Sequence, residues 1–305
     1  MLSNGLEAIL RSDEHGLVLV IDGIEQSHLG SPGAPPRHAS HRWMLAASLA
    51  VLAERGPVGA GDPAALHLGG GAAALPRALQ HAVPALRQRV VELEPALVDL
   101  VAQGAPLPRG IEVVVGDGRA VLERAVLDSA VREHAVREHA GPGRAGSVTL
   151  VTIDVFGAGR VPAPFTTVEC FAAARAALEP GGALVVNSAD GPPLRFVRAQ
   201  VATLQSVFAH VALVSTGSTL AGARHSNIVL VASDAPLPVD GIRDRVRVGP
   251  PPAAVVEGPR LARFVADTAP QPVRDATAVD SAPPVRSAYL GSGALPPSLV
   301  DPLDD

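Results

Sequence analysis

The sequence predicts an α/β fold: a doubly wound, mostly parallel sheet of seven strands, with a small N-terminal β-hairpin domain and a Pro-rich C-terminal tail. Two observations lead to this fold class. Strand-like runs alternate with helix-length segments between residues 64 and 208, which favours parallel pairing with helices on both faces. Runs such as VTLVTIDV are continuously apolar, as expected of strands that are buried on both sides.

The N-terminal region begins with two short apolar runs, residues 6–11 and 17–22, which are separated by the turn sequence SDEHG. This pattern is typical of a β-hairpin, and we assign it to a small domain covering residues 1–35. A Gly/Pro loop follows at 29–37. Residues 39–54 are rich in Ala and Leu and predict a helix that ends before Gly56 and Pro57.

The central region, residues 36–235, carries the alternation from which the sheet is predicted. Five strands are expected at 64–68, 89–94, 111–117, 148–156 and 183–188. The helices between and after them are expected at 72–82, 95–103, 118–128, 166–178 and 194–208. Within these elements, Cys170 and His67 are expected to be buried core residues.

Two further strands, 210–215 and 227–233, follow without a helix-length segment between them. The eleven connecting residues are rich in Gly, Ser and Thr, which suits an antiparallel pair near the edge of the sheet. A seven-stranded sheet with a reversed last strand is the methyltransferase-like variant of the doubly wound fold. We therefore treat residues 36–235 as a nucleoside-binding domain of that kind.

Two segments do not follow this alternation. Residues 129–146 contain AVREHAVREH, in which His, Glu and Arg recur at a spacing of five; metal-binding pairs on a helix prefer a spacing of four, so a solvated helix is expected and no metal site. Residues 236–305 hold 13 of the 29 prolines. We expect one short helix at 254–267 and a poorly ordered tail beyond residue 268.

Composition excludes several classes of function. The 305-residue chain has a net charge of −5, and all of its 25 Lys and Arg residues are Arg, so a Schiff-base or P-loop lysine is excluded and nucleic acid is not an expected partner. A single cysteine excludes an intramolecular disulfide. Without a signal-like start or an 18-residue apolar run, we expect a cytoplasmic protein that does not bind membranes.

The candidate site is predicted at the carboxyl ends of the strands, where ligands bind in open parallel sheets. The residues found there are, in chain order, Gly69, Gly70 and Gly71, then Glu92, then Asp117, then Asp154. Glycines let the backbone approach a ligand, an acid after the second strand can accept from both ribose hydroxyls, and Asp117 can accept from an adenine amine. Glu94, by contrast, is expected to cap the following helix. The order and spacing indicate a nucleoside pocket and favour an S-adenosylmethionine-type ligand over NAD.

Five segments carry a specific resemblance: ALHLGGGAAALPRALQ, VVELEPALVDL, IEVVVGDGRAVLE, LVTIDVFGAG and LEPGGALVVN, with LVIDGIEQSH upstream. Over residues 15–233 the chain resembles the spermidine synthase (polyamine aminopropyltransferase) family, most closely its divergent spermidine synthase-like members in high-GC bacteria. The resemblance implies a β-hairpin domain before a methyltransferase-like domain. It also implies transfer of an aminopropyl group from decarboxylated S-adenosylmethionine to a small-molecule amine. The donor would be a co-substrate, and no tightly bound cofactor is implied. The resemblance further implies a homodimer.

The resemblance also implies roles for individual residues. Gly69, Gly70 and Gly71 correspond to the family's glycine turn, Glu92 to its ribose-binding acid and Asp117 to its adenine contact. Asp154 corresponds to the first aspartate of the DSxD motif, a general base or amine-orienting group, and Gln26 to a glutamine at the mouth of the pocket. Asn187 corresponds to a polar position lining the cleft, and we expect it to contact the substrate.

Three positions differ from the family's pattern, and each weakens the prediction of a polyamine-binding site. The acid that would hold the donor's terminal amine is replaced by Ala72, and the second aspartate of DSxD is replaced by Gly157. No aromatic residue stands where the family has a tyrosine, near Thr219. Two alternatives therefore stay open: a methyltransferase that uses ordinary S-adenosylmethionine, and a non-catalytic binding protein on the same scaffold.

Overall fold

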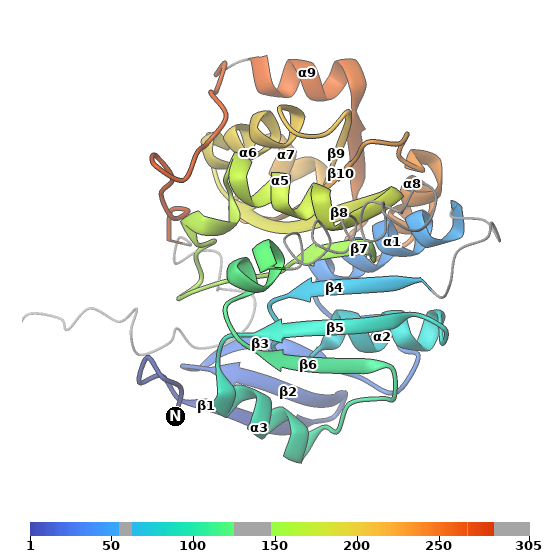
Figure 1. The fold of residues 1–305 in the computed structure, drawn as a ribbon, viewed down its shortest axis with the longest axis vertical. Coiled ribbons are helices and arrows are strands. Elements are labelled where there is room, and N and C mark those ends of the chain that lie inside the picture. The colour runs from blue at the N-terminus through green and yellow to red at the C-terminus, as the bar shows by residue number, and fades with distance from the viewer. Residues whose placement is uncertain (55–62, 125–147, 267, 284–305) are drawn as a thin grey trace, which may run out of the picture.

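Two β-sheets organise the chain, and Figure 1 shows both. The computed structural model describes residues 1–54, 63–124, 148–266 and 268–283. Within these residues the larger sheet has eight strands in the order β11-β9-β10-β8-β7-β4-β5-β6. These are β4 (Ala64–Leu68), β5 (Arg87–Glu92), β6 (Ile111–Val115), β7 (Val148–Ile153), β8 (Leu178–Asp190), β9 (His210–Ser215), β10 (Ser226–Ser233) and β11 (Ala254–Glu257).

The pairing in the larger sheet confirms the predicted fold class. Strands β4 to β8 pair in parallel, and β10 lies antiparallel between β8 and β9, as the methyltransferase-like variant requires. The eighth strand, β11, pairs antiparallel with β9 and was not predicted. The expectation of a single helix at 254–267 is wrong for its first four residues: they extend the sheet, and the helix α9 begins at Gly258.

Helices cover both faces of this sheet, so its strands are apolar on both sides. The described helices are α1 (Ala39–Glu54), α2 (Ala74–Ala82), α3 (Pro95–Gly104), α5 (Val168–Ala177), α6 (Arg195–Gln205), α7 (Gly217–Leu220), α8 (Val239–Arg247) and α9 (Gly258–Ala266), with further helical residues at 118–124. Helices α1 and α8 pack with Leu150 and Val185, whereas α5 and α6 pack with Val151 and Val186 on the opposite face. Alternate residues of β7 and β8 thus belong to two different cores.

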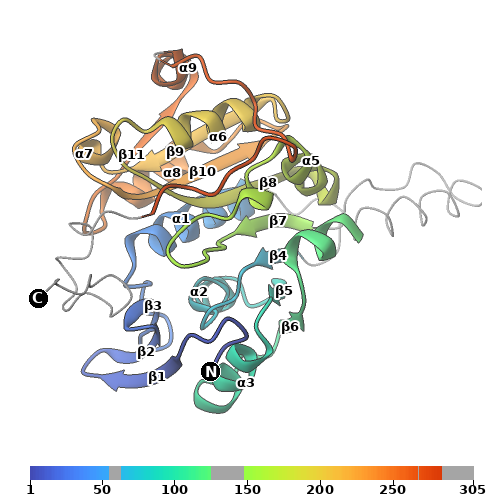
Figure 2. The same ribbon diagram turned by 90° about the vertical axis from the view of Figure 1, so that its left-hand side faces the viewer.

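The smaller sheet is formed by β1 (Ala8–Asp13), β2 (Gly16–Ile21) and β3 (Ile24–Leu29), all antiparallel. The hairpin β1–β2 was predicted, but β3 was not, because its sequence IEQSHL lacks a regular alternation of apolar and polar residues. A β-bulge explains this, since Leu19 pairs with Ser27 and Val20 with Glu25, which leaves Gln26 as the extra residue. Figure 2 shows this sheet beside α2 and α3.

The C-terminal region corrects the expectation of a poorly ordered tail for residues 268–283, whereas residues 284–305 lie outside the described residues. Residues 268–283 lie across the loop between β7 and α5 and hydrogen-bond to it. The Val168 amide donates to the Val273 carbonyl at 2.8 Å, and the Ser281 amide donates to the Val161 carbonyl at 3.0 Å. We call residues 268–283 the C-terminal strap. The strap also forms an ion pair between Asp275 and Arg119 at 3.0 Å.

Two further expectations concern a membrane-spanning helix and the helices predicted at 118–128 and 129–146. Among the described residues, no helix combines the length and the apolar character needed to cross a bilayer. The expected insertion helix at 129–146, and the last part of the expected helix at 118–128, lie outside the described residues.

Candidate active site

The site begins at the glycine turn between β4 and α2. Gly69 has a φ of +90°, which side chains rarely adopt, and a Cβ placed on it would lie 2.2 Å from the carbonyl oxygen of Asp154. The Asp154 amide in turn donates to the carbonyl of Leu68 at 2.9 Å. Glycine at position 69 therefore lets the ends of β4 and β7 lie directly against each other.

Glu92, the last residue of β5, is held by this turn. One carboxylate oxygen of Glu92, Oε2, accepts hydrogen bonds from the backbone amides of Gly70 at 2.9 Å and Gly71 at 3.1 Å. The other oxygen, Oε1, accepts from the amide of Glu94 at 3.1 Å. Each carboxylate oxygen has two lone pairs, so both of those on Oε2 are used, while Oε1 retains one that can accept from a ligand hydroxyl.

Glu94 has a different role from Glu92. It is the N-cap residue of α3, but its side chain makes no capping hydrogen bond. Instead the carboxylate accepts from both the backbone amide and the hydroxyl of Ser3. The expected capping role is therefore wrong for the side chain, which ties the N-terminus to the larger domain.

Asp117 and Gln26 are the two other residues predicted to bind the donor. Asp117 is exposed, follows β6, and accepts from the Ala120 amide at 3.1 Å at the start of the helical residues 118–124. Gln26 is half-buried at the bulge in β3. Its neighbour Ser27 is the β3 residue beside the glycine turn, with Oγ 3.5 Å from the Ala72 amide.

Asp154, just beyond β7, contacts two side chains from distant elements, and a third side chain holds one of these two. His41 Nε2 of α1 lies 2.8 Å from Asp154 Oδ2, and Asn187 Nδ2 of β8 donates to Asp154 Oδ1 at 2.8 Å. Asn227 Nδ2 of β10 donates to Asn187 Oδ1 at 3.1 Å. Burial would raise the pKa of the Asp154 carboxyl, but His41 and the Asn187 amide outweigh burial and hold this pKa below its ordinary value.

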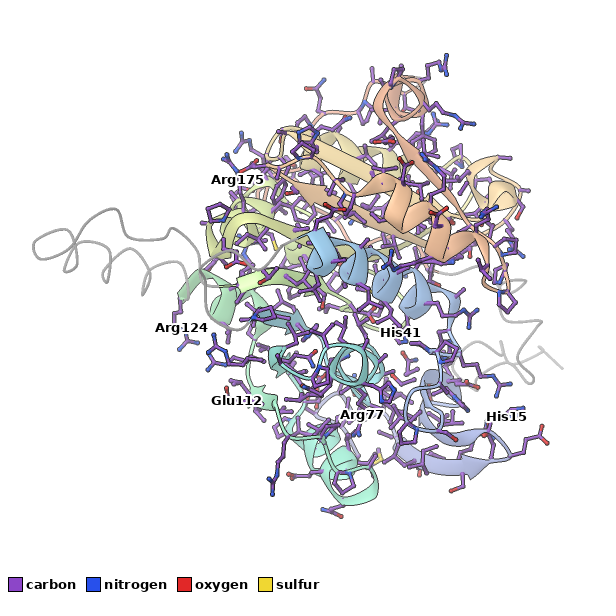
Figure 3. All side chains as sticks on the ribbon, turned by 90° about the vertical axis from the view of Figure 1, so that its right-hand side faces the viewer. His15, His41, Arg77, Glu112, Arg124 and Arg175 are labelled. Carbon is purple, nitrogen blue, oxygen red and sulfur yellow. The ribbon has the colours of Figure 1, made fainter. Side chains whose placement is uncertain are left out.

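His41 is a residue of this site that sequence reasoning missed. It lies in the first turn of α1, at the end of the helix nearer the small sheet, as Figure 3 shows. The sequence separates His41 from Asp154 by 113 positions, so no local motif joins them. The available signal was a histidine at the start of an apolar helix that was expected to pack on the sheet.

The departures from the family pattern have structural counterparts. Ala72 is fully buried in an apolar cluster with Leu19 and Leu97, so position 72 belongs to the contact between the two sheets. Gly157 is exposed, and a Cβ added to it would meet nothing within 4 Å. The glycine turn thus joins Glu92 and Asp154, while position 157 presents no side chain.

Two other expectations concern a buried histidine and a bound metal ion. His67, predicted to be a core histidine, is buried between Thr152 Oγ1 at 2.8 Å and Gln88 Oε1 at 3.0 Å, which confirms the prediction. Within the described ranges, no three His, Cys, Asp or Glu side chains gather in an arrangement that could hold a metal ion.

Comparison with known proteins relates this geometry to a family. No family model and no curated protein matches the sequence. A crystal structure of a probable spermidine synthase from Corynebacterium glutamicum matches with a TM-score of 0.76 and 27% identity, over 90% of this chain and 95% of that one. Its structural neighbours are thus spermidine synthases, which supports a divergent spermidine synthase-like protein.

Two solved structures of lower sequence identity agree with this fold. A spermidine synthase in complex with the transition state analogue AdoDATO matches with a TM-score of 0.53 at 15% identity, over 81% of this chain and 77% of that one. Human methyltransferase-like protein 13 in complex with SAH matches with a TM-score of 0.52 at 19% identity, over 78% and 96%. The chain thus has the fold of S-adenosylmethionine-type transferases.

Proposed function

We propose that this chain is a transferase that binds decarboxylated S-adenosylmethionine, or a related sulfonium nucleoside, and moves its aminopropyl group to an amine. One observation carries the proposal: Glu92 and Asp154 flank the same glycine turn, Glu92 through hydrogen bonds to Gly70 and Gly71 and Asp154 through its contact with Gly69. A single ligand with a ribose at Glu92 therefore has its reacting end close to Asp154.

Aminopropyl transfer requires that the protein bind the donor, hold the amine in line with the carbon beside the sulfonium, and remove a proton from the ammonium. On the donor side, Glu92 would accept from the ribose hydroxyls and Asp117 from the adenine amine. On the acceptor side, the Asp154 carboxylate would attract the incoming ammonium. The similar structures that hold AdoDATO and SAH support a ligand of this class.

Two alternative functions each have a supporting observation. The fully buried, uncharged Ala72 provides no acid for the aminopropyl amine, which favours a methyltransferase using ordinary S-adenosylmethionine. A non-catalytic binding protein is favoured by Gly157, since no carboxylate stands at that position for a second ammonium. Aminopropyl transfer remains our preferred function because the similarity to a probable spermidine synthase extends over 90% of the chain.

The location, the oligomeric state and the substrate class of this activity are also proposals. We infer a cytoplasmic homodimer acting on a small-molecule amine, with Gln26 at the mouth of the pocket and Asn187 on the acceptor side. The hydrogen bond from Asn187 to Asp154 supports the second of these roles. Sedimentation velocity on the purified protein would test the dimer.

Calorimetric titration of the purified protein with both forms of S-adenosylmethionine tests the proposed function. The proposal predicts binding of the decarboxylated form, with ordinary S-adenosylmethionine binding more weakly. Tighter binding of ordinary S-adenosylmethionine would favour the methyltransferase. Binding of neither would overturn both enzymatic functions and leave the binding protein.

A further inference from the structure

The hydrogen bond between His41 and Asp154 fixes which ring nitrogen of His41 carries a proton. Asp154 is an ionised carboxylate at neutral pH, because its pKa lies below the ordinary value, and an ionised carboxylate only accepts hydrogen bonds. His41 Nε2, 2.8 Å from Asp154 Oδ2, must therefore be the donor. In the neutral ring, the proton is then on Nε2, and Nδ1 has a free lone pair.

The other ring nitrogen of His41, Nδ1, lies in a buried position. The side chain is only 10% exposed, and Nδ1 is buried without a hydrogen-bond partner among the described residues. A buried nitrogen lone pair that accepts no hydrogen bond is costly, and it is more often found where a ligand supplies the donor. An N–H group of the acceptor amine is such a donor.

Asp154 itself is poorly suited to take a proton. Both of its oxygens already accept hydrogen bonds from this chain, Oδ2 from His41 and Oδ1 from Asn187. Asn227 donates to the carbonyl oxygen of Asn187, which keeps the Asn187 amide group turned towards Asp154. Protonation of Asp154 would disrupt this chain of donors, whereas protonation of His41 would strengthen its bond to the carboxylate.

We propose that His41, held by Asp154, is the general base of the transferase. This inference rests on the proposed function and deepens it. Nδ1 of His41 takes a proton from the acceptor ammonium, which leaves a neutral amine and an imidazolium paired with Asp154. The amine lone pair then forms the new N–C bond at the carbon beside the sulfonium. The C–S bond breaks, and its electron pair returns to sulfur to give a neutral thioether nucleoside.

Other titratable groups surround this pair and set its electrostatic environment. His38, one turn earlier, meets the His41 ring edge-on with centroids 5.7 Å apart. Burial lowers the pKa of His38 to about 4, so it is neutral at pH 7. Glu25 lies 3.6 Å from His38, and the charges of His28 and Arg37 also reach His38.

Replacing His41 by Gln separates two functions of the imidazole ring: donating a hydrogen bond to Asp154 and accepting a proton from the amine. The Gln amide can still donate to Asp154 Oδ2, so the carboxylate stays in position, but it has no nitrogen that accepts a proton. Rates are measured with decarboxylated S-adenosylmethionine as donor and two acceptors, butylamine and trifluoroethylamine. The amine of trifluoroethylamine is already neutral at pH 7 and needs no base.

We expect His41→Gln to lower kcat with butylamine by about 10²- to 10⁴-fold, with a much smaller loss for trifluoroethylamine. The rise of the rate with pH that marks a titrating base should disappear. The donor KM should change by less than about threefold. His210→Gln, at an exposed position where β9 begins, is the control and should retain the rate and the pH profile.

Several outcomes would overturn the inference. Transfer to butylamine by His41→Gln at the wild-type rate and with the wild-type pH profile would refute the base while leaving the proposed function intact. An equal loss with both acceptors would assign His41 a positioning role only. If the wild-type chain binds the donor but transfers to no amine, the base and aminopropyl transfer both fail. Absence of donor binding would refute the proposed function as a whole.

Discussion

A Cβ atom on Gly69 would lie 2.2 Å from the carbonyl oxygen of Asp154, closer than any real side chain approaches a backbone oxygen. The two residues directly follow neighbouring parallel strands, β4 and β7. The lack of a side chain at position 69 therefore sets how closely the two halves of the site can meet.

Gly69→Ala should lower the free energy of unfolding by at least about 2 kcal/mol, because the new methyl group both requires a rare φ and displaces the Asp154 backbone. Urea denaturation measures the change. Gly157→Ala is the control, since its Cβ would meet nothing within 4 Å, and it should stay within about 0.5 kcal/mol of the native protein. A Gly69→Ala protein of native stability would mean that the strand ends can separate without cost.

Glu92→Ala should weaken binding of decarboxylated S-adenosylmethionine far more than Glu94→Ala. The first loses a charge-assisted contact to the ribose, which costs about 1.5–3 kcal/mol, or about ten- to a hundredfold in Kd. Glu94 holds Ser3 instead, so its loss should affect the N-terminus and not the ligand. Calorimetry gives both affinities, and similar losses for the two variants would remove the ribose assignment.

Gly157→Asp should raise the rate of transfer to putrescine more than the rate of transfer to butylamine. Putrescine carries a second ammonium that needs a carboxylate, and position 157 has open space for one. A new charged hydrogen bond is worth about 1.5–3 kcal/mol, or about ten- to a hundredfold. Quantifying the products by mass spectrometry provides the comparison. If both acceptors gained equally, the aspartate would act on the reaction generally and not on the far ammonium.

Removal of the C-terminal strap should destabilise the protein. A chain ending at residue 267 is compared with a chain ending at residue 283, so that only the strap differs between them. The strap supplies backbone bonds to Val161 and Val168 and the ion pair between Asp275 and Arg119. We expect a loss of at least about 2 kcal/mol in the free energy of unfolding. Indistinguishable melting curves for the two chains would contradict the packing of this segment.

The sequence predicted those parts of the fold whose signal is local. Continuous apolar runs such as VTLVTIDV identified the buried strands, and the reversed strand β10 followed from a connection too short for a crossover helix. Strand β3 was missed because the bulge at Gln26 breaks the alternation. Strand β11 was missed because four residues give too short a pattern to separate from the following helix.

The sequence predicted only some residues of the candidate site. Glu92 and Asp154 could be found because each lies at the carboxyl end of a recognisable strand and the topology brings strand ends together. His41 could not, because its place beside Asp154 depends on how α1 packs on the sheet, which no local pattern specifies. The strap was missed since its contacts are single hydrogen bonds from a Pro-rich segment without a strand or helix pattern.

The central claim is that an amine is aminopropylated at Asp154. The direct measurement is mass spectrometry of a mixture of small amines incubated with decarboxylated S-adenosylmethionine and either the native chain or Asp154→Asn. The account predicts one or more aminopropylated amines and an equal amount of methylthioadenosine from the native chain, with about a hundredfold less from Asp154→Asn. Donor binding without any such product, or the same yield from Asp154→Asn, would contradict the account.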